Sequence, residues 1–223
     1  MKHLAVIMDG NGRYAVARGE ERAEGHKAGA EAFARAVGDL SDLPIDVLTV
    51  YAFSTENGGR PQSEVSNILD VIAYFLQNRI YVIAEEKRIN VRFIGNIAAL
   101  PERVGKIVTN APVFEDAEKT VVIALNYGGW DEVCRAAEKI THSGKKIDEE
   151  ELKRNLDAPD LPFPDAVLRY GGYKRLSNFM PLQTAYSELF FTDKYWPEYD
   201  KNDFLSVIEK FGKIKRNFGG IYA

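Results

Sequence analysis

Met8-Asp9-Gly10-Asn11-Gly12-Arg13-Tyr14 is the stretch from which the organisation of the chain can be worked out. It follows the apolar run 4–8 and precedes a helix-compatible run over 14–18, which predicts a strand, a tight glycine turn and a helix start. Gly10 and Gly12 allow backbone N–H groups to approach a ligand with no Cβ in the way. The first turn of the helix offers unpaired N–H donors and the positive end of a dipole, which favour an anion such as phosphate.

Two charged side chains of this turn narrow the choice of ligand. Arg13 adds a cation to the predicted anion site, whereas Asp9 places a carboxylate where an anion should bind. The carboxylate is understandable if a divalent metal lies between Asp9 and a phosphate oxygen. Asp-Gly-Asn-Gly is also an ordinary surface turn, so this stretch taken alone leaves both interpretations open.

Composition limits the class of protein. The chain has 223 residues, within the range of one α/β domain spanning 1–223, and 45% of them are hydrophobic, enough for a sizeable core. A net charge of −4 argues against a nucleic-acid partner, because binding to phosphate backbones needs a basic face. The single Cys134 excludes an internal disulfide and fits a reducing compartment. With no targeting or membrane-spanning run in view, we expect a cytoplasmic protein.

Helical and extended stretches alternate along the chain, which predicts an α/β domain with a mostly parallel sheet. The predicted strands are 4–8, 47–53, 90–94, 120–126, 166–169 and 189–191. The predicted helices are 28–40, 64–87, 131–140, 148–155 and 201–215. Pro61 precedes the helix 64–87, whose apolar residues recur with a helical period, and Ser63 is a candidate N-cap.

Nearly every predicted strand is followed directly by glycine, polar or charged residues. These segments are 9–13, 54–60, 95–96, 126–129 and 169–175. Ligands of open parallel sheets bind beyond the carboxyl ends of the strands, so the segments should meet at one edge. Arginines and a carboxylate gathered at this edge predict a site that handles phosphate groups.

The sequence resembles a known family. Residues 4–13 followed by Gly25-His26-Lys27-Ala28-Gly29 resemble the opening of the cis-prenyltransferases, the undecaprenyl diphosphate synthase family. Further blocks agree in order and spacing at 51–57, 126–129, 169–179 and 185–193, and 218–220 looks like the family's ending. The resemblance covers essentially the whole chain, and the aspartate-rich DDxxD motif of the all-α prenyltransferases is absent from the sequence.

The resemblance implies a fold, a reaction and partners. The fold would be a single α/β domain with a central six-stranded, mostly parallel sheet flanked by helices. The activity would be transfer of the prenyl group of an allylic diphosphate, of the farnesyl or geranylgeranyl type, to isopentenyl diphosphate with cis geometry, with Mg²⁺ as cofactor and release of diphosphate. The family also implies a homodimer, and a lipid product implies transient contact with a membrane.

The resemblance also assigns roles position by position. Asp9 would bind Mg²⁺ and assist departure of the allylic diphosphate, and Glu188 would be a second carboxylate at the metal. Ser54 and Asn57 would be catalytic residues of a loop near the reacting carbons. The positions expected to hold the substrate diphosphates are Gly10, Asn11, Gly12, Arg13, Arg22, His26 and Arg60 on the allylic side and Arg169, Arg175 and Ser177 on the acceptor side.

An allylic cation must meet its acceptor before water does, so an apolar tunnel should lie beside the charged site. The apolar face of the helix 64–87 is the candidate for one wall of this tunnel. Leu125 stands directly before Asn126, where the long-chain members commonly have alanine. If the Leu125 side chain faces the tunnel, its bulk predicts short products.

The acceptor side departs from the family pattern at five positions, which are Gly58, Tyr170, Tyr173, Leu182 and Asn217. These changes leave open a single transfer to another acceptor, such as a small alcohol that would give an ether, or a branching or cyclising reaction. A non-catalytic partner subunit is a further alternative, although such subunits typically lose the Asp9 and Arg13 positions. A P-loop nucleotide enzyme is disfavoured because its glycine-rich motif is absent from the sequence.

Overall fold

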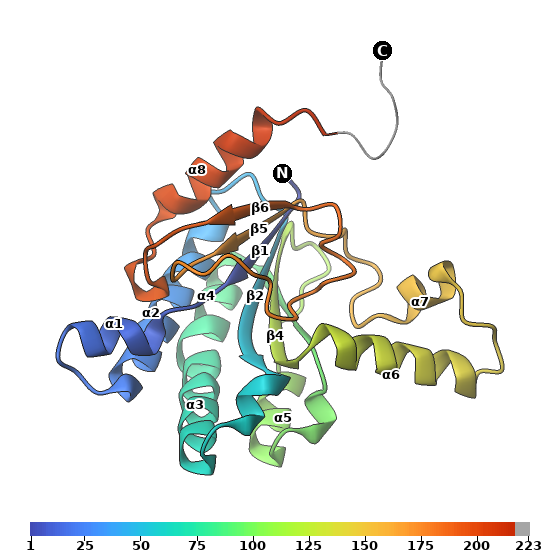
Figure 1. The fold of residues 1–223 in the computed structure, drawn as a ribbon, viewed down its shortest axis with the longest axis horizontal. Coiled ribbons are helices and arrows are strands. Elements are labelled where there is room, and N and C mark those ends of the chain that lie inside the picture. The colour runs from blue at the N-terminus through green and yellow to red at the C-terminus, as the bar shows by residue number, and fades with distance from the viewer. Residues whose placement is uncertain (217–223) are drawn as a thin grey trace.

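In the computed structural model, which describes residues 1–216, one parallel sheet forms the centre of the molecule (Figure 1). Its six strands run in the order β3-β4-β2-β1-β5-β6, and every neighbouring pair is parallel. The strands are β1 His3–Ile7, β2 Val47–Ser54, β3 Ile89–Ile94, β4 Lys119–Tyr127, β5 Ala166–Arg169 and β6 Glu188–Phe191. The predicted α/β fold is therefore confirmed, with a sheet that is entirely rather than mostly parallel.

Helices cover both faces of this sheet, as expected when parallel strands are joined by crossovers. They are α1 Asn11–Ala17, α2 Arg22–Leu40, α3 Gln62–Phe75, α4 Tyr81–Lys87, α5 Glu102–Thr109, α6 Gly129–His142, α7 Glu149–Asn155 and α8 Lys201–Gly212. Figure 1 shows α1, α2 and α3 grouped on one side of the view and α6 and α7 extending on the other. No helix within residues 1–216 is long and apolar enough to span a lipid bilayer.

The buried side chains divide into two layers, one on each face of the sheet. The larger layer packs β1, β2 and β4 against α2, α3, α4 and α5, and it includes Trp196 and Phe204 near the start of α8. The smaller layer lies on the opposite face and includes Tyr127 and Phe179. Successive residues of a strand point to opposite faces, so strands buried on both sides read as continuous apolar runs.

The structure corrects several predicted helix boundaries. The predicted helix 64–87 is interrupted by a π-helical turn, η2 Leu76–Ile80, which separates α3 from α4. Ser63 does not cap this helix, because Pro61 occupies the N-cap position and no side-chain cap is made. The helix predicted at 28–40 begins earlier, at Arg22, and this places His26 on α2 as well.

His3 gives the fold a pH dependence that can be tested. Its ring is buried between the carbonyl of Pro162, 2.6 Å from Nδ1, and the hydroxyl of Thr49, 2.7 Å from Nε2. Burial lowers the pKa of His3 from 6.5 to about 4. Because the unfolded chain takes up this proton first, the contribution of His3 to stability is complete above pH 6.5 and is lost as the pH falls towards 4.

We therefore expect acid to destabilise the wild type more than a His3→Gln variant. Between pH 6.5 and pH 4 the wild type should lose about 3 kcal/mol more free energy of unfolding, measured by urea denaturation. Equal losses in the two proteins over this pH range would show that His3 is not the group responsible.

Candidate active site

A cavity of about 680 Å³ opens at the carboxyl edge of the sheet. Its walls come from the segments that follow β1, β2 and β5 and from the first turns of α1 and α2. The residues that line it include Asp9, Gly10, Asn11, Gly12, Arg13, Arg22, His26, Ser54, Asn57, Arg60, Arg169, Arg175 and Ser177. The structure thus brings together the candidate residues of the sequence analysis with one exception, Glu188.

The segments after β3 and β4 do not line this cavity. The Gly95 N–H donates to the carboxylate of Asp157 at 2.8 Å, and a Cβ at Gly95 would overlap the carbonyl oxygen of Leu125. Gly128 packs against the side chain of Thr55 in the same manner. These glycines allow close packing of the chain behind the site, so the expectation that all five segments form the site is wrong for these two.

Asp9 links two arginines at the centre of the cavity. Its Oδ1 accepts a hydrogen bond from Arg13 Nη2 at 3.1 Å, and its Oδ2 accepts one from Arg169 Nη2 at 2.9 Å. Arg13 is one helical turn further along the chain, whereas Arg169 ends a neighbouring strand. A single carboxylate therefore faces two cations, which leaves net positive charge in the wall for an anionic ligand.

Arg169 is almost completely buried, with 4% of its surface exposed. Its Nη1 donates to Ser177 Oγ at 2.8 Å and to the carbonyl of Arg175. Its Nε is buried without a hydrogen-bond partner among residues 1–216. Unsatisfied buried donors are rare in folded proteins, so this arrangement indicates a position for an anion beside Arg169, Arg175 and Ser177.

Gly10 and Gly12 also allow close packing within the site itself. Gly10 has a φ of 98° and lies against the ring of Tyr195, where a Cβ would come within 2.5 Å of Cδ1. A Cβ at Gly12 would come within 2.9 Å of the guanidinium carbon of Arg22. The sequence suggested that these glycines admit a ligand, whereas in the structure they also admit Tyr195 and Arg22 against the turn.

Asn11 and His26 place polar atoms at the inner end of the cavity. Asn11 Oδ1 and His26 Nε2 are both buried and have no hydrogen-bond partner within the described part of the chain. Burial lowers the pKa of His26, and the nearby charges of Arg60 and Arg22 lower it further. The imidazole is therefore neutral near pH 7 and can exchange hydrogen bonds with a bound ligand.

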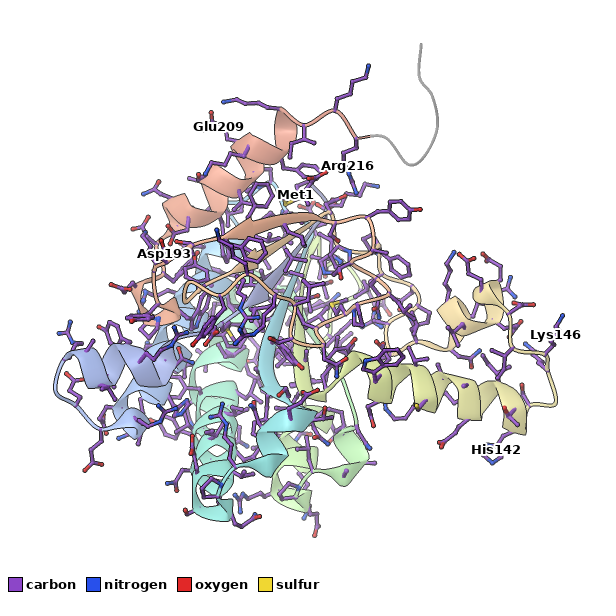
Figure 2. All side chains as sticks on the ribbon, in the orientation of Figure 1. Met1, His142, Lys146, Asp193, Glu209 and Arg216 are labelled. Atoms are coloured by element: carbon purple, nitrogen blue, oxygen red, sulfur yellow. The ribbon has the colours of Figure 1, made fainter. Side chains whose placement is uncertain are left out.

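Of the chain's three histidines, His26 alone lines this cavity, since His3 begins β1 at the opposite end of the strand and His142 ends α6. Figure 2 shows His142 and Lys146 at the tip of the α6–α7 arm, well away from the side of the molecule where Asp193 is labelled. The resemblance had selected His26 among the three, and α2 places its side chain in the wall of the cavity.

The loop that carries Ser54 and Asn57 is stabilised by these two residues. The Asn57 N–H donates to Ser54 Oγ at 3.2 Å, and the Ser54 N–H donates to Asn57 Oδ1 at 3.0 Å, which together cap the short helix η1 Thr55–Gly59. Glu56 accepts a hydrogen bond from Asn178 Nδ2 at 2.7 Å, so this loop is also joined to the segment after β5. Glu56 and Asn178 were not among the predicted site residues, although both line the cavity.

A second, apolar cavity of about 70 Å³ continues from the first. The two share the lining residues Met8, Asn11, His26, Ala52 and Ile68. The walls of the apolar cavity come from α2, from the sheet, and from Ile68, Val71, Ile72, Phe75, Leu76 and Ile80 on α3 and η2. Residues of the helix predicted at 64–87 therefore line an apolar cavity beside the charged one, and the tunnel role of this cavity stays a prediction.

Leu125 does not line this apolar cavity. Its side chain is completely buried in the larger core layer, whereas Ile123, on the same strand, reaches the cavity wall. The argument for short products from the bulk of Leu125 is therefore wrong for this structure.

The chain matches a known protein family. A family model described as putative undecaprenyl diphosphate synthase matches residues 7–219, nearly the whole chain. The chain belongs to this family. Its members are cis-prenyltransferases, so the protein is an enzyme that transfers prenyl groups, and the resemblance seen in the sequence is confirmed.

Similar proteins cover the chain from end to end. The isoprenyl transferase of Thermotoga maritima is 42% identical, with 99% of this chain and 97% of that protein aligned. The ditrans,polycis-undecaprenyl-diphosphate synthase of Salmonella typhi, described as specific for (2E,6E)-farnesyl diphosphate, is 40% identical, with 98% and 90% aligned.

Solved structures agree in fold. The lavandulyl diphosphate synthase of Lavandula x intermedia, in complex with dimethylallyl diphosphate, has a TM-score of 0.88 at 27% identity, with 98% of each chain covered. A probable undecaprenyl diphosphate synthase of Campylobacter jejuni has a TM-score of 0.80 at 32% identity, with 99% of each chain covered.

Glu188 does not lie with Asp9 in this cis-prenyltransferase chain. It begins β6 opposite Ala166, whereas the site edge of the same strand pair is Arg169 opposite Phe191. Three residues of extended strand separate the two ends by about 10 Å. Within residues 1–216 no group of three or more His, Cys, Asp or Glu side chains could hold a metal ion. The metal role assigned to Glu188 is therefore not supported within one chain.

The acceptor-side departures from the family pattern lie in different places. Tyr170 is completely buried, and its hydroxyl hydrogen bonds to Asp203 at 3.1 Å, so it belongs to the packing of α8. Gly58 and Leu182 do not line the cavity. Tyr173 is the departure that contacts the site arginines. Asn217 and residues 218–220 lie outside the described residues.

Gly25 and Gly29, which belong to a block that resembles the family but had no predicted role, are packing positions beside the site. A Cβ at Gly25 would overlap the carbonyl oxygen of Asn11, and one at Gly29 would come within 2.5 Å of Asn11 Oδ1. Both glycines therefore let α2 press against Asn11. Their spacing of four residues, which places them on one face of a helix, is a signal that could have identified them.

Proposed function

We propose that this enzyme binds an allylic prenyl diphosphate of the farnesyl or geranylgeranyl type and joins it to isopentenyl diphosphate with cis geometry, releasing diphosphate with the help of Mg²⁺. One observation carries the proposal: a single cavity gathers Asp9, five arginines and one histidine and continues into an apolar cavity. The arginines are Arg13, Arg22, Arg60, Arg169 and Arg175, and the histidine is His26.

The inner side of the cavity suits the allylic diphosphate. Arg13, Arg22, Asn11 and His26 would hold its phosphate oxygens, and the prenyl chain would extend past Ile68 into the apolar cavity. When the allylic C–O bond breaks, negative charge develops on the departing diphosphate. Fixed guanidinium groups stabilise that charge in the transition state, because they need no reorganisation as it forms.

The outer side suits the second diphosphate. Arg169 has an unpartnered buried Nε and donates to Ser177, and Arg175 is exposed beside them. These residues would hold isopentenyl diphosphate with its double bond directed towards the allylic carbon. Ser54 and Asn57 lie in the wall between the two diphosphate positions, and we assign them to orienting the reacting carbons.

Asp9 is the residue that fits Mg²⁺. Mg²⁺ is usually bound through one or two carboxylates together with substrate phosphates, and Asp9 is a carboxylate in the wall of the arginine-lined cavity. When bound there, Mg²⁺ would neutralise charge on the diphosphate oxygens. Arg13 and Arg169, which now pair with Asp9, would then turn towards the two diphosphates.

A single transfer to an alcohol acceptor is the alternative that the departures raised. It is not favoured, because Arg169, Arg175 and Ser177 retain the arrangement expected of a second anion site, and Tyr170 and Leu182 lie outside the cavity. A non-catalytic partner subunit is disfavoured for a different reason: Asp9 and Arg13 are both present and paired.

The proposal is tested by incubating the protein with labelled dimethylallyl, geranyl, farnesyl and geranylgeranyl diphosphates, each with and without isopentenyl diphosphate, and identifying the products by mass. We expect elongated cis products in Mg²⁺ and none in excess EDTA. Elongation that persists in EDTA would contradict the Mg²⁺ requirement. A donor consumed only when an alcohol is supplied would replace this proposal with the single-transfer alternative.

We also expect a homodimer, because the edge strand β6 exposes an apolar face. Leu189 and Phe191 alternate along it and are 45% and 36% exposed, while Phe190 packs inward. Light scattering at micromolar concentration should give twice the chain mass of 25.0 kDa, and Leu189→Lys should increase the monomer fraction. A wild-type monomer would contradict this expectation.

We further place the enzyme in the cytoplasm, with its lipid product passing to a membrane.

A further inference from the structure

Tyr173 lies among the arginines of both proposed diphosphate sites. The centre of its ring is 4.0 Å from the guanidinium carbon of Arg175, 4.6 Å from that of Arg13 and 5.8 Å from that of Arg169. All three distances are within the range at which a cation is attracted to the face of an aromatic ring. One uncharged side chain therefore contacts three cations.

The backbone that carries this ring is fixed. Gly171 and Gly172 precede Tyr173 with φ values of 84° and 79°, a conformation that favours glycine. Their N–H groups donate to the carbonyls of Lys194 at 2.7 Å and Thr192 at 2.9 Å. The ring is thus presented to the arginines by a clamped segment rather than by a free loop.

The three arginines depend on the ring to different extents. Arg13 also contacts Asp9, the carbonyl of Gly171 at 2.8 Å and the ring of Tyr195 at 5.4 Å. Arg169 is held by Asp9 and Ser177. The exposed guanidinium of Arg175 has no carboxylate or hydrogen-bond partner within residues 1–216, so the Tyr173 ring is the contact that places it.

We propose that Tyr173 is a positioning residue that holds the Arg175 guanidinium ready for the second diphosphate. A carboxylate at this position would also hold the arginine but would compete with the diphosphate for its charge. An aromatic ring holds the cation and leaves the charge available, and Tyr173 does not itself line the cavity. This inference rests on the proposed function, which assigns Arg175 to isopentenyl diphosphate.

Two variants distinguish the effect of the aromatic ring from the effect of side-chain bulk. Tyr173→Leu removes the aromatic face, and we expect the KM for isopentenyl diphosphate to rise about fivefold. The kcat and the KM for the allylic diphosphate should change less than about twofold, because Arg13 keeps its other partners. Tyr173→Phe retains the ring and should restore the wild-type KM. Thermal unfolding of both variants shows whether the fold is intact.

Arg175→Gln provides a second measurement. If the ring acts through Arg175, adding Tyr173→Leu to this variant should cause no further rise in the KM, whereas independent effects would multiply. Multiplying effects, an unchanged KM in Tyr173→Leu, or equal rises in the Leu and Phe variants would each overturn the proposal.

The failure of the proposed function would be visible separately, as a wild type that does not use isopentenyl diphosphate. In that case calorimetric titration with inorganic pyrophosphate still tests the ring. Tyr173→Leu should bind pyrophosphate about fivefold more weakly than Tyr173→Phe. Equal affinities would overturn the positioning role.

Discussion

Replacing Asp9 with asparagine is expected to reduce kcat by about a thousandfold or more. Removing one group that stabilises charge in a transition state typically costs a factor of about 10² to 10³, and Asp9 is also the proposed Mg²⁺ ligand. Asparagine has the same shape, so the variant tests the charge of this residue. The measurement is steady-state elongation at saturating Mg²⁺, with product formation followed by mass.

The stability of the Asp9→Asn variant must be measured as well, because the change leaves buried Arg169 without its carboxylate. We expect a loss of about 1–3 kcal/mol in the free energy of unfolding, small enough for the protein to remain folded. Asp116→Asn is a matched control, since Asp116 also pairs with an arginine, Arg88, but at the exposed surface. That control should leave kcat unchanged. An Asp9→Asn enzyme within tenfold of wild type would refute the role given to Asp9.

The fold was largely predictable because its strands are buried on both faces. Strands such as β1 and β4 appear as uninterrupted apolar runs, and the rule that ligands bind at the carboxyl edge placed Asp9 and Arg169 together although they are far apart in the sequence. The helix α5 was not among the predicted helices, although Pro101 at its N-cap is a start signal.

The errors arise where function depends on register or burial. Glu188 precedes the predicted strand 189–191, so the carboxyl-edge rule places it at the end away from the site, whereas the family resemblance assigned it to the metal. In the structure Glu188 and Phe191 do occupy opposite ends of β6. Tyr170 and Tyr173 belong to the same block, yet one is buried against Trp196 and the other covers Arg175. The packing of α8 and the two glycines between these tyrosines give them different roles, and the sequence block alone does not distinguish the two.

Gly25 is the position where one added methyl group should have the largest effect on the fold around the site. It lies on α2 where the helix crosses the turn after β1, and a Cβ there would overlap the backbone carbonyl of Asn11. Backbone cannot move aside as a flexible side chain can. We therefore expect Gly25→Ala to lower the free energy of unfolding by about 3 kcal/mol and to displace Asn11 from the cavity wall.

A second glycine of α2 provides a control for the clash expected at Gly25. Gly38 is also on α2, but nothing lies within 4 Å of a Cβ built there. Gly38→Ala should raise the free energy of unfolding by about 0.5–1 kcal/mol, because alanine loses less conformational entropy in a helix. Gly29→Ala should fall between them, since its Cβ meets the side chain of Asn11, which can rotate.

Activity should follow a different order from stability in these three variants. Gly29→Ala should retain most of its stability but lose activity, because the rotated Asn11 amide no longer faces the allylic diphosphate. Gly38→Ala should keep both, and Gly25→Ala should lose both. Urea denaturation and the elongation assay on the same preparations measure the two orders. If Gly25→Ala were as stable as Gly38→Ala, close packing of α2 on Asn11 would not be what these glycines provide, and the position of Asn11 would need another cause.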